Sequence, residues 1–241
     1  MEMIRVLILG HKGMLGHMVV KYLSDKCVCY TTPHRFPSDE FKHDILNFDG
    51  DYIINCVGAI PQRKNEFQVN FELPIWLSQS ANCNVIHPST DCEVDDNDYG
   101  ISKRRAAEYI KTYSKNTKIL KTSIIGPELN GHSSLLSWFI HSTGEVKGYK
   151  NAYWNGITTL EWAKLCHNMI NWWDDFDVEN IAQSECISKY ELLCIFKELY
   201  QKDIIIIPFE NNLIDKCLNG AIITKHIKDQ LEELKKYYES N

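Results

Sequence analysis

Tyr99 and Lys103 are the two side chains in this sequence best suited to acid–base chemistry. They are four residues apart, a spacing that places both on one face of a helix. A lysine ammonium beside a phenol favours the phenolate and so lowers the phenol pKa from its usual value of about 10. A tyrosine tuned in this way can give a proton to a carbonyl oxygen while a hydride reaches the carbon. Because the spacing is common by chance, its meaning depends on the surrounding elements.

Two hydroxyl side chains, Ser89 and Thr90, follow an apolar segment at 84–87 that reads as a buried strand. Ligands of parallel α/β sheets bind at the carboxyl ends of the strands. A hydroxyl in this place is positioned to hydrogen-bond a substrate carbonyl, and the alternative is a cap or turn at the strand end. We therefore expect Ser89 and Thr90 to face the substrate.

A glycine-rich loop lies near the N-terminus, where Gly10, Gly13 and Gly16 have the spacing G-x-x-G-x-x-G. The loop follows an apolar strand and opens a helix, whose free N–H groups would hold a pyrophosphate. The first glycine permits the turn, the second lets the phosphate approach, and the third lets the helix pack on the strand. The pattern predicts a dinucleotide site, with a tight turn of packing glycines as the alternative.

The region after the second expected strand indicates which dinucleotide binds. An enzyme that uses NADH has an acidic residue there for the ribose 2′-hydroxyl, about 20 residues after the glycines. No acid occurs at 30–35, whereas Arg35, with His34 or Lys12, is suited to a 2′-phosphate. The sequence therefore favours NADPH over NADH, which remains possible.

The elements that must position these groups alternate along the first half of the chain. Helices are expected at 14–23, 69–81 and 100–113, and Pro74 is expected to kink or break the second of them. Strands are expected at 4–9, 26–30, 51–57, 84–87 and 118–125. Strand–helix alternation with apolar strands predicts an α/β fold, a Rossmann-type doubly wound parallel sheet.

The second half of the sequence has a different character. It begins after Pro127, with helices expected at 135–141, 158–173, 188–200 and 225–238 and a strand at 204–208. Capping-box patterns open the second and third of these helices. Trp154 lies in a polar stretch between glycines and is expected to line a sugar site. We expect residues 1–127 to form an NAD(P)-binding core, and 128–241 a small, mainly substrate-binding lobe with elements returning to the core.

Composition excludes several classes of protein. The 241 residues carry a formal net charge of −6, which disfavours nucleic-acid binding. No apolar run approaches the roughly 20 residues needed to cross a bilayer, and the N-terminus does not resemble a signal peptide. The nine cysteines are scattered without C-x-x-C, and the histidines have no metal-ligand spacing. We expect a cytoplasmic protein with reduced cysteines and no metal, a zinc site being the minor alternative.

Taken together, the motifs resemble those of the extended short-chain dehydrogenase/reductase superfamily and, within it, the dTDP-4-dehydrorhamnose reductase family. The similarity continues in the second half through residues 136–139 and 154–160, which resemble sugar-nucleotide reductases of polysaccharide clusters. The segments that carry the resemblance in the first half are Gly13-Met14-Leu15-Gly16, Ile54-Asn55-Cys56-Val57-Gly58, Val69-Asn70, Ser89-Thr90-Asp91, Tyr99-Gly100-Ile101-Ser102-Lys103 and Lys121-Thr122-Ser123-Ile124-Ile125-Gly126.

The resemblance implies NADPH-dependent reduction of a nucleotide-linked 4-keto-6-deoxy sugar in deoxysugar or polysaccharide biosynthesis. Tyr99 would be the acid, Lys103 its modulator and ribose anchor, and Thr90 the group that polarises the keto oxygen. The partner would be the nucleotide sugar, with a homodimer possible. With Tyr99 and Lys103, the residues implied to contact the cofactor are Gly10, Gly13, Met14, Leu15, Asp44, Ile45, Cys56, Val57 and Gly58.

The chain departs from the family pattern between Thr90 and Tyr99, where it has a short, acidic segment in place of a longer loop. Acidic side chains near a diphosphate repel it unless they face solvent. The short segment favours a second hypothesis, a non-catalytic NADP(H)-binding regulatory subunit, which the intact Tyr99 and Lys103 oppose. A third hypothesis is a nucleotide-sugar epimerase or dehydratase, which would recycle bound NAD.

Overall fold

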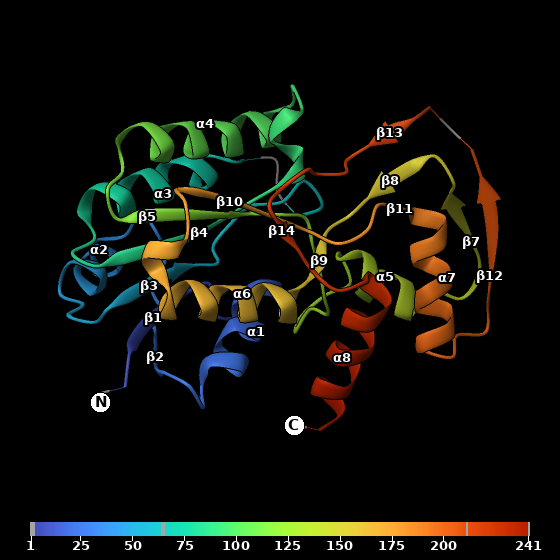
Figure 1. Cartoon of the computed structure of the whole chain (residues 1–241), viewed down its shortest axis with the longest axis horizontal. Helices are drawn as coiled ribbons and strands as arrows, with labels where there is room; N and C mark the ends of the chain where they lie inside the picture. Colours follow the sequence, from blue (N-terminus) through green and yellow to red (C-terminus); the bar gives the residue numbers. More distant parts are fainter. Residues whose placement is uncertain (1–2, 64–65, 211, 241) are drawn as a thin grey trace. The chain divides into compact units, whose positions relative to one another are not determined.

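A computed structural model describes residues 3–63, 66–210 and 212–240 of the chain, which group into two compact units (Figure 1). Unit 1 comprises Met1–Lys121 and Ala163–Asn180. Unit 2 comprises Thr122–Trp162 and Ile181–Asn241. The division predicted at residue 127 remains a prediction, because compactness does not test which segment binds the cofactor or the substrate.

Unit 1 is built on a sheet in the order β2-β1-β3-β4-β5, which continues to the first residues of β10. The neighbouring pairs from β2 to β5 are all parallel. The last residues of β10 belong to unit 2 and pair in parallel with β14. The strands are β1 (Arg5–Leu9), β2 (Val28–Thr31), β3 (Tyr52–Asn55), β4 (Asn84–Ser89), β5 (Thr117–Lys121), β10 (Glu179–Gln183) and β14 (Ile222–Ile223).

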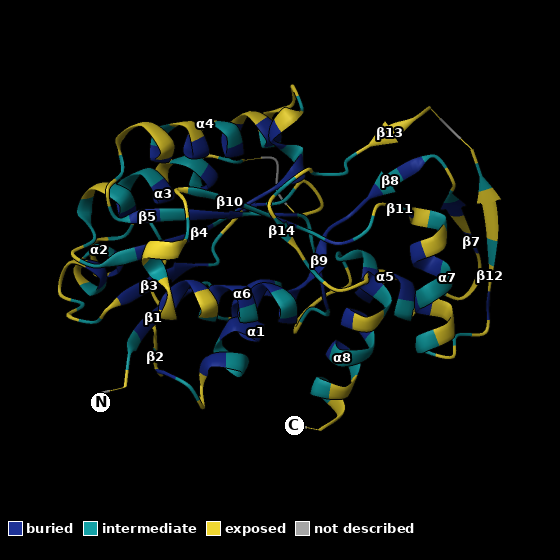
Figure 2. Cartoon of the chain, in the orientation of Figure 1, coloured by how far each residue is buried: buried dark blue, intermediate teal, exposed yellow. Residues whose placement is uncertain are grey.

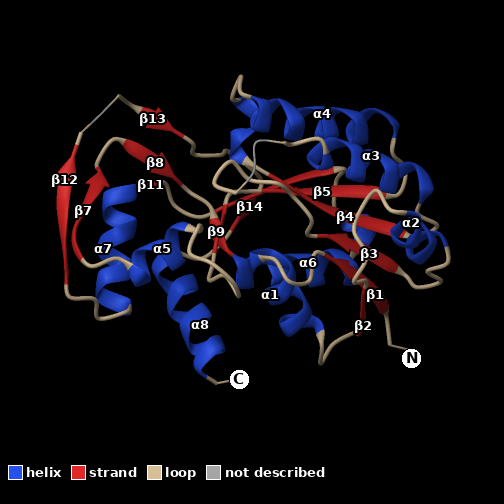
Figure 3. Cartoon of the chain, turned by 180° about the vertical axis from the view of Figure 1, so that it is seen from behind, coloured by secondary structure: helices blue, strands red, loops and turns tan. Residues whose placement is uncertain are grey.

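Helices cover both faces of the unit 1 sheet, with α2, α3 and α4 on one face and α1 and α6 on the other (Figures 1 and 3). This arrangement confirms the predicted doubly wound α/β fold and explains why the central strands β1, β3 and β4 are mostly buried. The helices are α1 (Met14–Leu23), α2 (Asp39–Leu46), α3 (Val69–Ser80), α4 (Asp98–Tyr113) and α6 (Thr159–Asn171), with short 3₁₀ turns η1 (Asp91–Val94) and η2 (Trp173–Asp175).

The hydrophobic core of unit 1 lies between this sheet and its helices (Figure 2). On one face, Leu7 and Ile53 of neighbouring strands pack with Phe41 of α2 and Leu73 and Leu77 of α3. All five side chains are buried. Because the strands are rigidly packed, their carboxyl ends form a fixed edge on which functional groups can be placed.

One helix of unit 1 was not predicted, the break allowed for at Pro74 does not occur, and one expected strand is divided. Helix α2 was not predicted, although Ser38 caps it by accepting from Phe41 N at 3.2 Å. Helix α3 continues through Pro74, because only one intrahelical N–H is lost there and the helix flank packs on the sheet. The strand expected at 118–125 is two strands: β5 ends at Lys121, and β6 (Ile124–Ile125) pairs with β9 in unit 2.

Unit 2 contains three small sheets, most of whose strands are too short to produce a periodic sequence signal. They are ordered β11-β8-β13, β12-β7 and β6-β9. The remaining strands are β7 (Gly144–Tyr149), β8 (Ala152–Trp154), β9 (Ile157–Thr158), β11 (Ile187–Ser188), β12 (Ile204–Phe209) and β13 (Ile214–Asp215), and the helices are α5 (Leu135–His141), α7 (Lys189–Leu199) and α8 (Ile227–Glu239).

The two predicted capping boxes of the second half behave differently. Ser188 and Glu191 form the complete box at the start of α7. At the start of α6, Thr158 Oγ1 accepts from Glu161 N at 3.1 Å, but Thr158 N donates to Gln230 Oε1 of α8 at 3.0 Å. The C-terminal helix therefore supplies the acceptor that the box would have taken from its own helix.

No helix in the described part of the chain has the length and apolarity to cross a bilayer.

A disulfide joins Cys186 and Cys217 in unit 2, which contradicts the expectation that all cysteines are reduced. The bond closes a loop between residues 31 apart, next to the outer strands β11 and β13. Within the described residues, these two cysteines and Asp215 are close enough to share a metal ion, but disulfide sulfurs are not thiolate ligands. Sequence spacing gave no signal for this pair, because its members meet only through the fold of unit 2.

We expect the double variant Cys186→Ser/Cys217→Ser to lower the free energy of unfolding by about 2–4 kcal/mol, because the cross-link restricts the unfolded chain. Urea unfolding with and without a dithiol reductant measures this effect. The reductant should destabilise the wild type and leave the double variant unchanged. Equal wild-type curves under both conditions would contradict the prediction.

Candidate active site

The glycine loop forms a tight turn between β1 and α1. Gly10 has a φ of +74°, and a Cβ there would lie 2.8 Å from the carbonyl oxygen of Cys56. Gly13 N donates to Gly10 O at 2.8 Å and closes the turn. A Cβ on Gly16 would lie 2.2 Å from Gly10 O, so the third glycine lets α1 pack on the turn rather than on the strand as expected. Gly10 and Gly16 therefore require glycine for the fold itself.

The N-terminus of α1 is suited to hold a diphosphate. Gly13 is the N-cap and offers no capping side chain, and the first turn contains no acid. The opening N–H groups of a helix lack intrahelical acceptors and carry a partial positive charge. Met14 and Leu15 would contribute these backbone groups, while the exposed Lys12 lies beside them in the loop. The residues present therefore fit the pyrophosphate of a dinucleotide.

Asp44 of α2 belongs to a small polar cluster beside the end of β2. Its carboxylate accepts from Thr32 Oγ1 and lies 2.8 Å from His34 Nδ1. The hydrogen bond from Thr32, which is the largest effect, and the smaller one from His34 lower the pKa of Asp44. His34 is thus engaged by a carboxylate, and Arg35 is the exposed cation of the pair predicted for a 2′-phosphate. Ile45 is buried in the core, which leaves its backbone for any contact with adenine.

The segment after β3 lies against Lys103. Asn55 fixes its start, since Oδ1 accepts from Val57 N at 3.0 Å while Nδ2 lies 3.1 Å from His87 Nδ1. A Cβ on Gly58 would lie 3.9 Å from Lys103 Nζ. Residues Cys56–Gly58 therefore run along the edge of the sheet beside the predicted ribose anchor, as expected for a cofactor-lining backbone.

Asn70 is a structural residue of this edge whose role the sequence did not reveal. Its amide accepts from Ala59 N at 2.7 Å, donates to Ala59 O at 2.9 Å, and donates to Ser102 Oγ at 3.2 Å. Ser102 in turn donates to Tyr99 O at 2.7 Å. One buried amide thus connects the segment after β3 to the first turn of α4. The only sequence signal was membership in the Val69-Asn70 pair.

Tyr99, Lys103 and Thr90 meet where α4 begins. Asn97 caps the helix by accepting from Gly100 N at 2.9 Å. Lys103 is buried and donates to Pro88 O of β4 at 3.3 Å. Thr90, also buried, directly follows β4. Its hydroxyl donates to Asp91 Oδ1 at 2.8 Å and accepts from Cys92 N at 3.2 Å, and it lies near enough to Tyr99 to lower the pKa of that phenol. The structure therefore brings the three predicted catalytic groups together.

Burial controls the ionisation of this pair. Desolvation raises the pKa of Tyr99 to about 12, which Thr90 opposes by hydrogen bonding. Desolvation likewise lowers the pKa of Lys103 to about 8. The expected lowering of the Tyr99 pKa by Lys103 is therefore wrong for this structure, because the ammonium is directed at Pro88 O and the loss of water outweighs it. Tyr99 keeps its proton at neutral pH, as a proton donor requires.

The short acidic segment is folded inward rather than spread around the site. Asp91 and Glu93 are buried in η1, whereas Asp98 is exposed and Asp96 pairs with Arg104 at 3.2 Å. The expected repulsion of a diphosphate thus does not apply to the whole segment. Ser89 Oγ donates to the Glu93 carboxylate, so the hydroxyl predicted to meet substrate has a protein partner.

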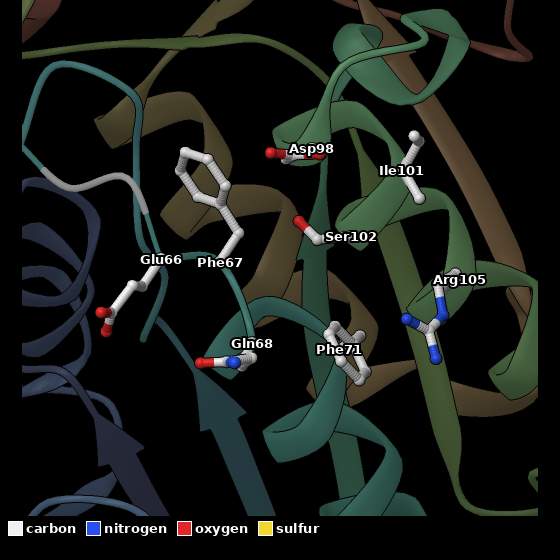
Figure 4. A pocket seen from close by; sticks show the side chains of 8 residues that line it. All are labelled: Glu66, Phe67, Gln68, Phe71, Asp98, Ile101, Ser102 and Arg105. Atoms are coloured by element: carbon white, nitrogen blue, oxygen red, sulfur yellow. The ribbon is translucent and has the colours of Figure 1, made fainter.

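A hollow of about 280 Å³ lies beside Tyr99, between the segment that precedes α3 and the first two turns of α4 (Figure 4). The ring of Phe67 lies between the hollow and Tyr99, since it packs edge-on to the Tyr99 ring with 5.7 Å between the ring centroids. The guanidinium carbon (Cζ) of Arg105 lies 4.1 Å from the centroid of the Phe71 ring. The sequence did not predict this feature. The hollow is lined by Glu66, Phe67, Gln68, Phe71, Asp98, Ile101, Ser102 and Arg105.

Trp154, the predicted sugar-lining residue, belongs to unit 2. It lies in strand β8 rather than in a loop, pairs with Ile187 and is 7% exposed. Gly156 adjoins its ring, because a Cβ there would lie 2.3 Å from Trp154 Cζ2. Its contact with substrate stays a prediction.

Comparison with solved structures gives full-length matches of low sequence identity. dTDP-4-dehydrorhamnose reductase from Bacillus anthracis in complex with NADP has a TM-score of 0.79 and 15% identity over 100% of both chains. UDP-N-acetylglucosamine 4-epimerase from Bacillus cereus has a TM-score of 0.71 and 16% identity over 99% of this chain and 97% of that one. GDP-mannoheptose C4 reductase from Campylobacter jejuni with NADP bound has a TM-score of 0.67 and 12% identity over 99% of both.

No family model and no curated protein matches the chain in sequence. At these identities the structural likeness establishes the fold, and it confirms the α/β architecture that the sequence predicted. The chain shares its fold, over its whole length, with the kind of sugar-nucleotide reductase that its motifs resemble.

Replacing Gly13 by alanine tests the diphosphate site. The backbone of Gly13 (φ −83°, ψ 169°) suits alanine, and the added Cβ would lie 3.2 Å from Gly10 O. We expect Gly13→Ala to fold and to bind NADPH at least about tenfold more weakly, because the methyl group blocks the phosphate. Gly16→Ala is the contrast and should destabilise the protein itself. Fluorescence titration and thermal melting separate the two, and unchanged NADPH affinity in Gly13→Ala would exclude this site.

Replacing Lys103 by methionine tests its burial. Since the folded pKa of about 8 lies below the usual 10.5, the folded state resists protonation. This cost is fully present below pH 8 and disappears as the pH rises toward 10.5. We expect Lys103→Met to be more stable than wild type by roughly 1–3 kcal/mol at pH 7, and by less at pH 10.

Urea unfolding of both proteins at the two pH values measures the difference, with exposed Lys12→Met as the control that should show none. A Lys103→Met variant less stable than wild type at pH 7 would contradict the assignment.

Proposed function

We propose that this protein reduces a nucleotide-linked 4-keto-6-deoxy sugar with NADPH, as an oxidoreductase of deoxysugar or polysaccharide biosynthesis. The observation that carries the proposal is the grouping of Tyr99, Lys103 and Thr90 at the sheet edge that also bears the Gly10–Gly13 turn. A diphosphate cradle and a protonated phenol at one edge are the parts that carbonyl reduction by a dinucleotide needs.

The roles of the side chains follow from their protonation states. Bound NADPH supplies the hydride for the keto carbon. The hydroxyl of Tyr99 carries the proton that the keto oxygen requires, and the edge-on packing of the Phe67 ring helps to orient the phenol. Lys103 places an ammonium beside Gly58 for the nicotinamide ribose and, when protonated, stabilises the phenolate that remains. Thr90 would hold the keto oxygen by turning its hydroxyl proton away from Asp91 Oδ1, to which it donates at 2.8 Å in this structure.

The choice of NADPH rests on the end of β2. No acid follows that strand directly, and Arg35 is exposed there. The reductases from Bacillus anthracis and Campylobacter jejuni contain NADP, which supports the same choice. NADH remains the alternative, and Asp44 would be the carboxylate nearest to its ribose hydroxyls because it is held at the end of β2. The cytoplasmic setting and a homodimer stay predictions.

The two other hypotheses predict different experimental observations. An epimerase would keep its dinucleotide through purification and show no net consumption of NADPH, and the Bacillus cereus epimerase shares this fold. A regulatory subunit would bind NADPH, capture a partner protein and lack turnover. The protonated Tyr99 beside Thr90 favours catalysis over that role.

We expect Tyr99→Phe to bind NADPH with unchanged affinity and to lose turnover by a factor of about 10²–10⁴, because the proton donor is removed while the ring remains. Absorbance of NADPH, followed with a panel of dTDP- and UDP-linked 4-keto-6-deoxy sugars, measures it. Tyr113→Phe, on the same helix at a 68% exposed side chain, is the matched control and should behave as wild type. Normal turnover by Tyr99→Phe would exclude the proposed acid.

A further inference from the structure

Glu93 is a buried carboxylate that none of the proposed catalytic steps uses. It lies in η1, between Thr90 and Tyr99, and is 5% exposed. Both of its oxygens are occupied: Ser89 Oγ donates to Oε1, and Lys121 Nζ donates to Oε2 at 2.6 Å. Ionised carboxylates are seldom buried unless paired in this way. Its position in the segment that departs from the family pattern makes it a feature of this chain.

The contacts of Glu93 connect the ends of three elements. Ser89 ends β4, Lys121 ends β5, and Arg104 of α4 donates to the Glu93 backbone oxygen at 2.9 Å. The packing against α4 is close, because a Cβ on Gly100 would lie 2.5 Å from both Cys92 O and Asp95 O. Movement of Glu93 would therefore disturb Thr90 on one side and the first turn of α4 on the other.

The negative charge of Glu93 also acts on Lys103. The ammonium donates to Pro88 O, next to Ser89, and the Glu93 carboxylate raises the pKa of Lys103 against the larger effect of desolvation. His87 is a further titratable side chain beside this ammonium: burial, and then the charge of Lys103, lower the pKa of its imidazole and keep it neutral. The further charged or titratable groups around the site are Lys121, Arg104, Glu179 at 3.9 Å from Lys121, and Asp91 and Cys92 near Tyr99.

We propose that Glu93 is a positioning residue of this site: its carboxylate, held by Ser89 and Lys121, fixes the end of β4 and with it Pro88 O, the acceptor of the buried Lys103 ammonium. The proposal deepens the proposed function, since it concerns the same Tyr99–Lys103 pair. It gives the short segment between Thr90 and Tyr99 the role of a charged brace.

The test is the titration of Lys103 itself, measured by NMR of protein labelled with ¹³C at the lysine Cε and assigned with Lys103→Arg. In Glu93→Gln we expect the midpoint of Lys103 to fall by roughly 0.5–1 pH unit, because a neutral amide no longer stabilises the ammonium. Glu179→Gln is the matched control: it removes the other carboxylate near Lys121 and should leave the Lys103 midpoint in place. An unchanged midpoint in Glu93→Gln would overturn the proposal.

A second measurement separates positioning from general damage. As the pH is raised and Lys103 loses its proton, the affinity for NADPH should begin to decline at a lower pH in Glu93→Gln than in wild type. Near pH 6.5, where Lys103 is protonated in both proteins, the two affinities should match. An equal loss at every pH would indicate a structural role alone and overturn the proposal. If Glu93→Gln does not fold, the double variant Glu93→Gln/Lys121→Gln removes the whole ion pair, and a smaller fall in the midpoint is expected because a nearby cation is lost as well.

The NMR titration needs neither cofactor nor substrate, so it stands apart from the proposed function. A lowered midpoint in a protein that reduces no nucleotide sugar would support the role of Glu93 and reject the reductase. Sugar reduction together with an unchanged midpoint would do the opposite.

Discussion

The loss of water around the Lys103 ammonium is the constraint on which the site depends. A buried cation without compensation would become neutral, and a neutral amine would neither hold a ribose nor assist a phenol. The chain offers Pro88 O as an acceptor and a carboxylate at Glu93, but neither restores the usual pKa. The result is an amine poised near neutrality, a state common among groups that take part in catalysis and costly to the stability of the fold.

The remainder of unit 1 serves to hold that edge still. The turn at Gly10 is pressed against Cys56 O, and the Asn55 and Asn70 amides fix the segment that follows β3. The two amides are buried and hydrogen-bonded, and the glycine allows close backbone contact, so the edge is rigid without side-chain bulk. A dinucleotide would thus meet backbone and small side chains that are already in place, and little ordering would remain for binding to supply.

The sequence predicted those parts whose signals are local. Apolar runs and glycine spacing located β1, α1 and the turn between them, and the tyrosine–lysine spacing located the start of α4, where the proposed catalytic groups lie. It did not predict the raised pKa of Tyr99, because desolvation depends on what covers a residue. It also missed the Cys186–Cys217 bond, the brace at Glu93 and the two-residue strands of unit 2, each of which exists only through contacts between distant segments. Trp154 appeared to lie in a loop because three residues are too few to show the alternation of a strand.

The division of the chain into discontinuous units has a consequence for biosynthesis. Unit 1 needs Ala163–Asn180 for α6 and the start of β10, and these residues leave the ribosome only after the first part of unit 2. Unit 2 in turn needs Gln230 to satisfy the N–H of Thr158. Neither unit can be completed by vectorial folding of a nascent N-terminal fragment. A nascent chain that ends near residue 121 would leave the side of β5 that pairs with β10 open to other strands until Glu179 and Asn180 have been synthesised.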